Sequence, residues 1–75
     1  MAGNSELKFT VVEEIAVLSE AGNWNKELNI VKWGDNEPKY DIRTWNNGRT
    51  RAGKGITLSL EEIKELKKAL NSLDV

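Results

Sequence analysis

The chain has 75 residues, a formal net charge of −1, no histidine and no cysteine. This length suits one small domain, and the missing residue types exclude disulfide bonds and the usual structural zinc sites. An enzyme would have to work with serine, threonine, lysine or carboxylates alone, and none of these stands in a recognisable catalytic arrangement. We therefore expect a protein with no catalytic activity, no cofactor and no metal.

The small net charge conceals a separation of charge along the chain. Residues 1–23 carry four glutamates against one lysine, and residues 24–57 carry seven cations against four acids. Residues 58–75 are again slightly acidic. Because a ligand responds to the local potential rather than to the average, the basic middle is the part most suited to a polyanion.

The two ends of the chain carry few signals. Residues 1–7 are predicted to be a flexible tail, and residues 8–75 to form the domain. The first residues lack the basic start and apolar segment of a signal peptide, and no apolar run approaches the roughly 18 residues that cross a bilayer. A cytoplasmic protein is expected.

The first predicted strand covers residues 9–18, FTVVEEIAVL, which are rich in β-branched side chains. The adjacent Glu13 and Glu14 break its alternation, and this predicts a β-bulge at that point. Residues 21–23, Ala-Gly-Asn, predict the turn that ends the first hairpin strand.

The next two predicted strands cover residues 26–33 and 39–45, separated by the turn-forming residues 34–38. Side chains of a strand alternate between its two faces. One face then carries side chains suited to burial, namely Leu28, Ile30, Tyr40, Ile42 and Thr44. The other face carries aromatic and charged side chains, namely Trp33, Lys39, Asp41, Arg43 and Trp45.

Asn47-Gly48 is a strong signal for a hairpin turn. Gly53-Lys54-Gly55 is interpreted as a glycine-permitted turn, followed by a short fourth strand at residues 56–57. Ser59 and Glu62 match a capping box and predict the start of a helix. Its apolar residues recur at three- and four-residue steps, and this broad stripe leaves an edge for a second copy of the chain.

The predicted fold is therefore α+β, a four-stranded curved antiparallel sheet followed by one C-terminal helix (β-β-β-β-α). With the helix on one face, we expect the other face to stay open. Small domains without disulfides often complete their core with a partner subunit, so a homodimer is expected.

An open face with both cations and indole rings suits single-stranded nucleic acid, which exposes phosphates and bases together. Few of these residues are fit to read base edges, so little sequence preference is expected. The candidate nucleic-acid-binding residues are Lys26, Trp33, Lys39, Arg43, Trp45, Arg49, Arg51 and Lys54.

Several alternatives remain open at this stage. Trp24 lies beside a turn, where burial in the core and exposure are equally compatible with the pattern. Arg43 has an alternative role as an ion-pair partner of Asp41. The alternatives to DNA as the ligand are RNA, or a protein partner docked on the open sheet face.

Two runs in the chain resemble the positive cofactor four family of single-stranded-DNA-binding proteins. They are Tyr-Asp-Ile-Arg-Thr-Trp at 40–45 and Gly-Lys-Gly-Ile-Thr-Leu-Ser at 53–59, which precedes an acidic and leucine-rich helix. The stretch Trp-Asn-Lys-Glu-Leu-Asn at 24–29 is similar to the YdbC-like bacterial branch. The likeness runs from about residue 26 to the end of the helix.

The resemblance implies a bacterial protein of the cytosol or nucleoid that binds single-stranded DNA in transcription, replication or repair. It implies DNA contacts at Trp33, Arg43, Trp45 and Lys54, with Arg49 or Arg51 in place of a loop lysine. It also implies a homodimer joined through the C-terminal helices, with the interface residues Ile63, Leu66, Ala69, Leu70 and Leu73. The turn after Trp33 differs from the family pattern because it is acidic, with Asp35 and Glu37.

Overall fold

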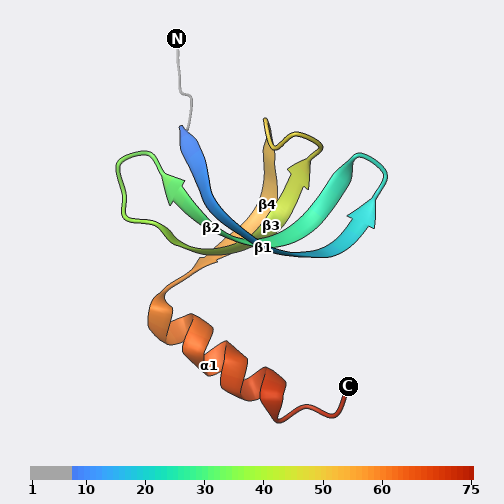
Figure 1. Ribbon diagram of the computed structural model, residues 1–75, viewed down its shortest axis with the longest axis vertical. Coiled ribbons are helices and arrows are strands. Elements are labelled where there is room, and N and C mark those ends of the chain that lie inside the picture. The colour runs from blue at the N-terminus through green and yellow to red at the C-terminus, as the bar shows by residue number, and fades with distance from the viewer. Residues whose placement is uncertain (1–7) are drawn as a thin grey trace.

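The computed structural model describes residues 8–75 and has the predicted α+β architecture (Figure 1). Four antiparallel strands lie in the order β1-β2-β3-β4, and one helix follows them. The predicted tail, residues 1–7, lies outside the described residues. The elements are β1 (Phe9–Ala21), β2 (Trp24–Trp33), β3 (Lys39–Asn46), β4 (Ala52–Leu58) and α1 (Leu60–Asn71).

Strand β1 is irregular and curves the sheet. Its pairing with β2 shifts register three times, between Val11 and Glu13, between Glu14 and Ala16, and between Val17 and Ser19. The bulge predicted at the two adjacent glutamates is confirmed. Each bulge adds a residue to one strand, which bends and twists it. Figure 1 shows the result, a sheet whose two ends curl towards the same side.

Strand β4 corrects one prediction, because Gly53-Lys54-Gly55 is part of a strand and not a turn. Gly55 pairs with Arg43 of β3, and a Cβ at Gly55 would overlap with the Cβ of Arg43. A Cβ at Gly53 would in the same way overlap with the hydroxyl of Thr44. The two glycines therefore allow the strands to approach closely.

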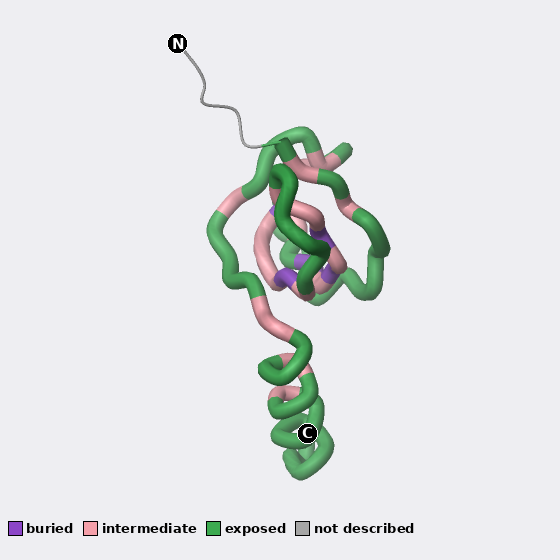
Figure 2. The backbone as a smooth tube through the Cα atoms, turned by 90° about the vertical axis from the view of Figure 1, so that its left-hand side faces the viewer, coloured by how far each residue is buried: buried purple, intermediate pink, exposed green. Residues whose placement is uncertain are grey.

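The curl gives the sheet an inner face and an outer face. The inner face carries Glu27, Asn29, Val31, Asp41 and Trp45, which are the buried residues among those described. The outer face carries the even-numbered residues of β2 and β3, which are at most half-buried. Figure 2 places the buried residues within the sheet and none on the helix.

This arrangement corrects one part of the expectation of an open aromatic face. The helix lines a cleft with Leu28 of the opposite face, as expected, but Trp45 is buried. The predicted sharing of a face by Trp33, Arg43 and Trp45 agrees with strand alternation, but that face is the concave one. In the strand register Trp45 lies opposite Asn25, eight positions from Trp33. A flat strand would separate such positions by roughly 26 Å. The curl instead brings the two indole rings to 6.0 Å between centroids.

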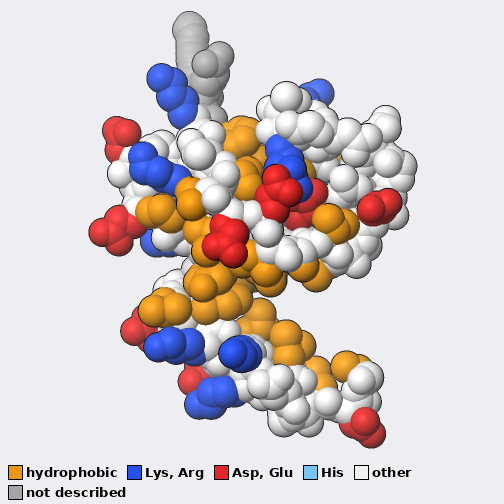
Figure 3. All heavy atoms as spheres, viewed as in Figure 1, with side chains coloured by type: hydrophobic (Ala, Val, Ile, Leu, Met, Phe, Trp, Pro, Cys, Tyr) orange, Lys and Arg blue, Asp and Glu red, His pale blue; other side chains and the backbone are white. Residues whose placement is uncertain are grey.

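Helix α1 begins with the predicted capping box. Glu62 donates its backbone N–H to the Ser59 hydroxyl at 3.1 Å, and Ser59 donates its own N–H to the Glu62 carboxylate at 2.8 Å. None of the helical residues is buried within the described chain. Figure 3 shows hydrophobic side chains on the side of the helix towards the sheet. An apolar cleft of about 260 Å³ lies between the helix and β2, and is lined by Leu28, Ile63, Leu66 and Leu70.

Candidate nucleic-acid interface

Three aromatic rings fill the inner face. The Trp33 and Trp45 indoles stack at 10° between planes, and Phe9 lies 5.7 Å from Trp33 and 5.1 Å from Trp45. Trp45 is 0% exposed and Trp33 is half-buried. The Trp45 ring is therefore covered by its own neighbours, and the expectation that it offers an open surface to a base is wrong.

The two stacked indoles have N–H groups without a hydrogen-bond acceptor in the part of the chain that the structure describes. The N–H groups of Trp33 and Trp45 are both buried and have no hydrogen-bond acceptor among residues 8–75. Buried donors in folded proteins nearly always find an acceptor. The inner face thus holds two donors that the described part of the chain does not satisfy.

Arg43 on the inner face is bound to Asp41, so the alternative role considered for Arg43 is confirmed. Its Nε and Nη2 donate to the two Asp41 oxygens at 2.6 and 2.9 Å, and its Nη1 donates to the Gly53 carbonyl at 3.2 Å. Asp41 is 0% exposed and also accepts the Thr57 hydroxyl at 3.1 Å. The guanidinium lies 4.7 Å above the Trp33 ring, within cation–π distance.

Arg49 is engaged in the same manner. It has a left-handed backbone with φ of 54°, and its Nε donates to Glu27 at 2.8 Å while Nη1 donates to Glu14 at 3.1 Å. Glu27 is only 2% exposed and accepts a further bond from Asn29 at 2.9 Å. Arg49 therefore ties the β3–β4 loop to β1 and β2, and carboxylates compensate its charge.

The outer face has cations of a different kind. Lys26 and Lys54 line one cleft of about 460 Å³, together with Ile42, Arg43, Thr44, Gly55 and Ile56. Of its three cations, Arg43 is already bound to Asp41. Both lysines are exposed, and no carboxylate lines this cleft or lies within ion-pair distance of them in residues 8–75. Their charge is available to an anion from solution.

The eight predicted residues therefore divide between two faces instead of forming one surface. Trp33, Arg43 and Trp45 lie on the inner face, where Arg49 binds Glu27, and Lys26 and Lys54 line the outer cleft. Lys39 is exposed at the start of β3, and Arg51 is exposed just before β4. Whether each contacts nucleic acid stays a prediction.

Trp24 is absent from the candidate nucleic-acid-binding residues that the sequence predicts, and the pattern there leaves both its burial and its exposure open. It is 39% exposed and shares the outer face with Lys26, two positions along β2. Extending the alternation of β2 back by two residues would have placed Trp24 beside that lysine. The predicted strand began at residue 26, and this boundary hid the relation.

Other kinds of site find little support. In the described residues, no three or more acidic, histidine or cysteine side chains group together to hold a metal ion. The helix that the structure describes is too short and too polar to cross a membrane.

Comparison with known proteins agrees with a nucleic-acid interface. The family model for Transcriptional Coactivator p15 (PC4) matches residues 20–69, a stretch that runs from the end of β1 through most of α1. An uncharacterized protein of Treponema pallidum (strain Nichols) is 37% identical over 73 residues, which are 96% of this chain and 86% of that protein. The matched family is one of non-enzymatic nucleic-acid-binding proteins.

Proposed function

The chain belongs to the transcriptional coactivator p15 (PC4) family, and from this premise we propose that it is a homodimeric single-stranded-DNA-binding protein. The proposal includes little sequence preference and no catalytic step. A cytoplasmic protein of this kind would serve processes that expose single strands, namely transcription, replication or repair.

The observation that carries the proposal is the uncompensated charge of the outer cleft. Lys26 and Lys54 line it and have no carboxylate partner among residues 8–75, whereas Arg43, which also lines it, and Arg49 are compensated by Asp41 and Glu27. Cations that meet phosphates release condensed counterions, and this supplies sequence-independent affinity for nucleic acid. We assign Lys26 and Lys54 as the central phosphate contacts, and exposed Lys39 and Arg51 as further contacts.

The inner-face residues have a supporting role in this proposal. Arg43 and Arg49 stabilise the curled sheet through ion pairs with buried Asp41 and Glu27. Trp45 stacks against the Trp33 ring and supports it. Trp33 is the half-buried member of the stack, and we assign it as the inner-face ring within reach of a base.

The homodimer is supported by the incomplete cover of the helix. Ile63 and Leu66 are half-buried, Ala69 is exposed, and Leu70 and Leu73 are 53% and 56% exposed. Apolar stripes of this kind mark interaction surfaces. A second α1 packed along this stripe would bury these side chains and enlarge a small core.

Titration of labelled oligo-dT, oligo-U and a duplex of equal length, each at two salt concentrations, tests the binding function. We expect salt-sensitive binding of oligo-dT with tryptophan quenching and weaker binding of the duplex. Equal or tighter binding of oligo-U would identify RNA as the ligand. Failure to bind all three would refute the proposal and favour a protein partner.

Sedimentation tests the dimer separately. We expect twice the protomer mass for the wild type at micromolar concentration and the protomer mass for Leu70→Glu, because a charge cannot be buried in an apolar interface at small cost. Lys64→Glu changes an exposed polar position of the same helix and should stay dimeric. A monomeric wild type would remove the dimer from the proposal.

A further inference from the structure

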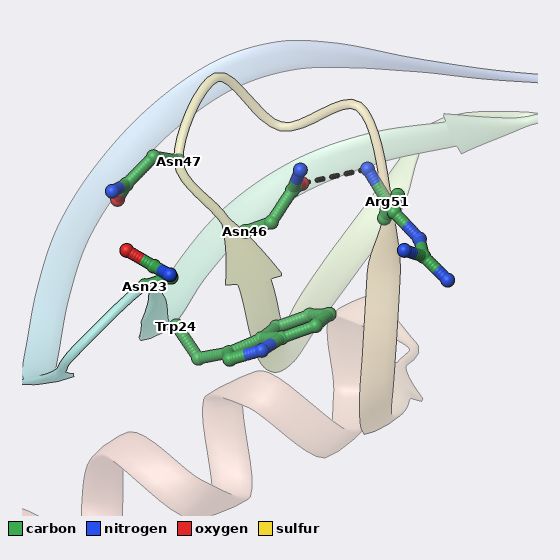
Figure 4. Close-up of a pocket in the computed structure, with 5 residues that line it drawn as sticks. All are labelled: Asn23, Trp24, Asn46, Asn47 and Arg51. Carbon is green, nitrogen blue, oxygen red and sulfur yellow. Dashed lines mark hydrogen bonds between the residues drawn. The ribbon is translucent and has the colours of Figure 1, made fainter.

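A polar pocket with an aromatic floor lies beside the turns of the two hairpins, at the end of the sheet next to the outer cleft. Its cavity volume is about 320 Å³, at the lower end of the range of about 300–1,000 Å³ for small-molecule sites. Figure 4 shows the Trp24 indole beneath Asn46, with Arg51 beside it and Asn23 and Asn47 across the cavity. These five residues line it.

The indole of Trp24 is positioned and accessible. A Cβ on Gly53 would meet Cζ3 of Trp24 at 3.3 Å, so the ring lies against the backbone of β4. At 39% exposure it is the most accessible of the three tryptophans, since Trp33 is half-buried and Trp45 is fully covered. A flat ring held in this way is a suitable surface for a second flat ring.

Arg51 brings an uncompensated charge to the same pocket. Its backbone is fixed by Asn46, which accepts the Arg51 N–H at 2.7 Å and donates its own N–H to the Arg51 carbonyl at 3.2 Å. Its guanidinium has no carboxylate partner in residues 8–75, and no acidic residue lines the pocket. A guanidinium of this kind is a preferred partner for phosphate.

The three asparagines differ in what they have left to offer. Asn46 is occupied, because its side-chain oxygen binds Arg51 and its amide donates to Thr50 at 2.7 Å. Asn47 accepts from Asn25 at 3.3 Å, and its own amide donates to none of the described residues. Asn23 makes no side-chain hydrogen bond within the described chain. Two carboxamides therefore remain for the polar edge of a ligand.

We infer that this pocket binds one nucleotide of a single strand, with the base stacked on Trp24 and its phosphate bound by Arg51. The inference rests on the proposed function and adds a base-binding site to it. The pocket shares its face with Lys26, two residues from Trp24, and with Lys54, three residues from Arg51. A strand bound by the lysines would thus continue into the pocket. Paired bases of a duplex have both faces stacked and cannot enter.

The test compares Trp24→Ala, Trp24→Phe and the wild type in binding oligo-dT and an abasic oligonucleotide of equal length. Loss of one stacking contact should weaken oligo-dT binding about tenfold in Trp24→Ala, while Trp24→Phe retains most of the affinity. The abasic strand should bind all three proteins alike, because it offers phosphates without bases. Far-UV circular dichroism establishes that each variant is folded.

A second measurement needs no variant. In the ¹H–¹⁵N spectrum of the wild type, oligo-dT should shift the indole N–H signal of Trp24 more than that of buried Trp45, and the abasic strand should not. If the wild type binds oligo-dT while the Trp24 signal and Trp24→Ala affinity stay unchanged, the pocket inference is wrong and the proposed function stands. If the wild type binds no oligonucleotide, both are wrong.

Discussion

The inner and outer faces of the sheet hold similar side chains in opposite states. On the inner face Arg43 and Arg49 are bound by Asp41 and Glu27, and both carboxylates are buried. On the outer face Lys26, Lys54 and Arg51 have no carboxylate partner among residues 8–75. Breaking a buried ion pair costs much stability, while removing a lone surface cation costs little. Residue type alone therefore does not separate cations that hold the fold from cations that are free to bind a ligand.

The tryptophans of the two faces should differ most. Replacing Trp45 with alanine should lower the free energy of unfolding by about 3–5 kcal/mol, because the ring is fully buried against Phe9 and Trp33. Urea denaturation followed by circular dichroism measures this. The exposed Trp24→Ala is the control, with an expected loss of no more than about 1 kcal/mol. Equal losses would contradict the division into two faces.

Removing the inner carboxylate comes next in size. Asp41→Ala leaves Arg43 without its partner and should cost about 3 kcal/mol of unfolding free energy. Asp35→Ala, at an exposed turn position, provides the control and should change stability by less than about 0.5 kcal/mol. If Asp41→Ala left the unfolding free energy unchanged, the ion pair would make no net contribution to stability.

Arg49 and Arg51 lie in the same loop, and their substitutions should have opposite effects on stability and binding. Arg49→Ala uncovers buried Glu27 and should lower the unfolding free energy by about 2 kcal/mol, less than a fully buried pair because Arg49 is partly exposed. Arg51→Ala should leave stability unchanged and weaken oligo-dT binding. Thermal melts measure the stability of both variants, and titrations measure their oligo-dT binding. The reverse pattern would place the binding surface on the Arg49 side of the loop.

The outer lysines should have the smallest effect on stability. Lys26→Ala/Lys54→Ala should keep the wild-type melting temperature and weaken oligo-dT binding. The slope of log affinity against log salt should become shallower by about 1.4, as two phosphate contacts to a single strand are lost. Lys64→Ala on the helix serves as control. An unchanged slope would mean that the outer cleft does not meet phosphates.

Local signals in the sequence predicted most elements of the fold. The capping box at Ser59, the bulge at Glu13 and the turn at Asn47 depend on neighbouring residues, and all three are found. Strand β4 was predicted too short because Gly53 and Gly55 have the composition of a turn. Glycine is needed at these two positions because β3 lies too close for a Cβ, and only the folded chain reveals this contact.

The candidate site was harder to predict because alternation gives the two faces but not the direction of curvature. It grouped Trp33, Arg43 and Trp45 correctly on one face. It did not indicate that the bulges of β1 would curl that face inwards and cover Trp45. The ion pairs of Arg49 with Glu14 and Glu27 join residues 35 and 22 positions apart, a distance that no sequence window covers.

The register shifts of β1 have a consequence for crowding. This strand forms one border of the sheet, where regular backbone groups would invite another chain to add a strand. Three interruptions within its thirteen residues put those donors and acceptors out of line. Crowded copies of the chain should therefore not grow into fibres through this edge of the sheet.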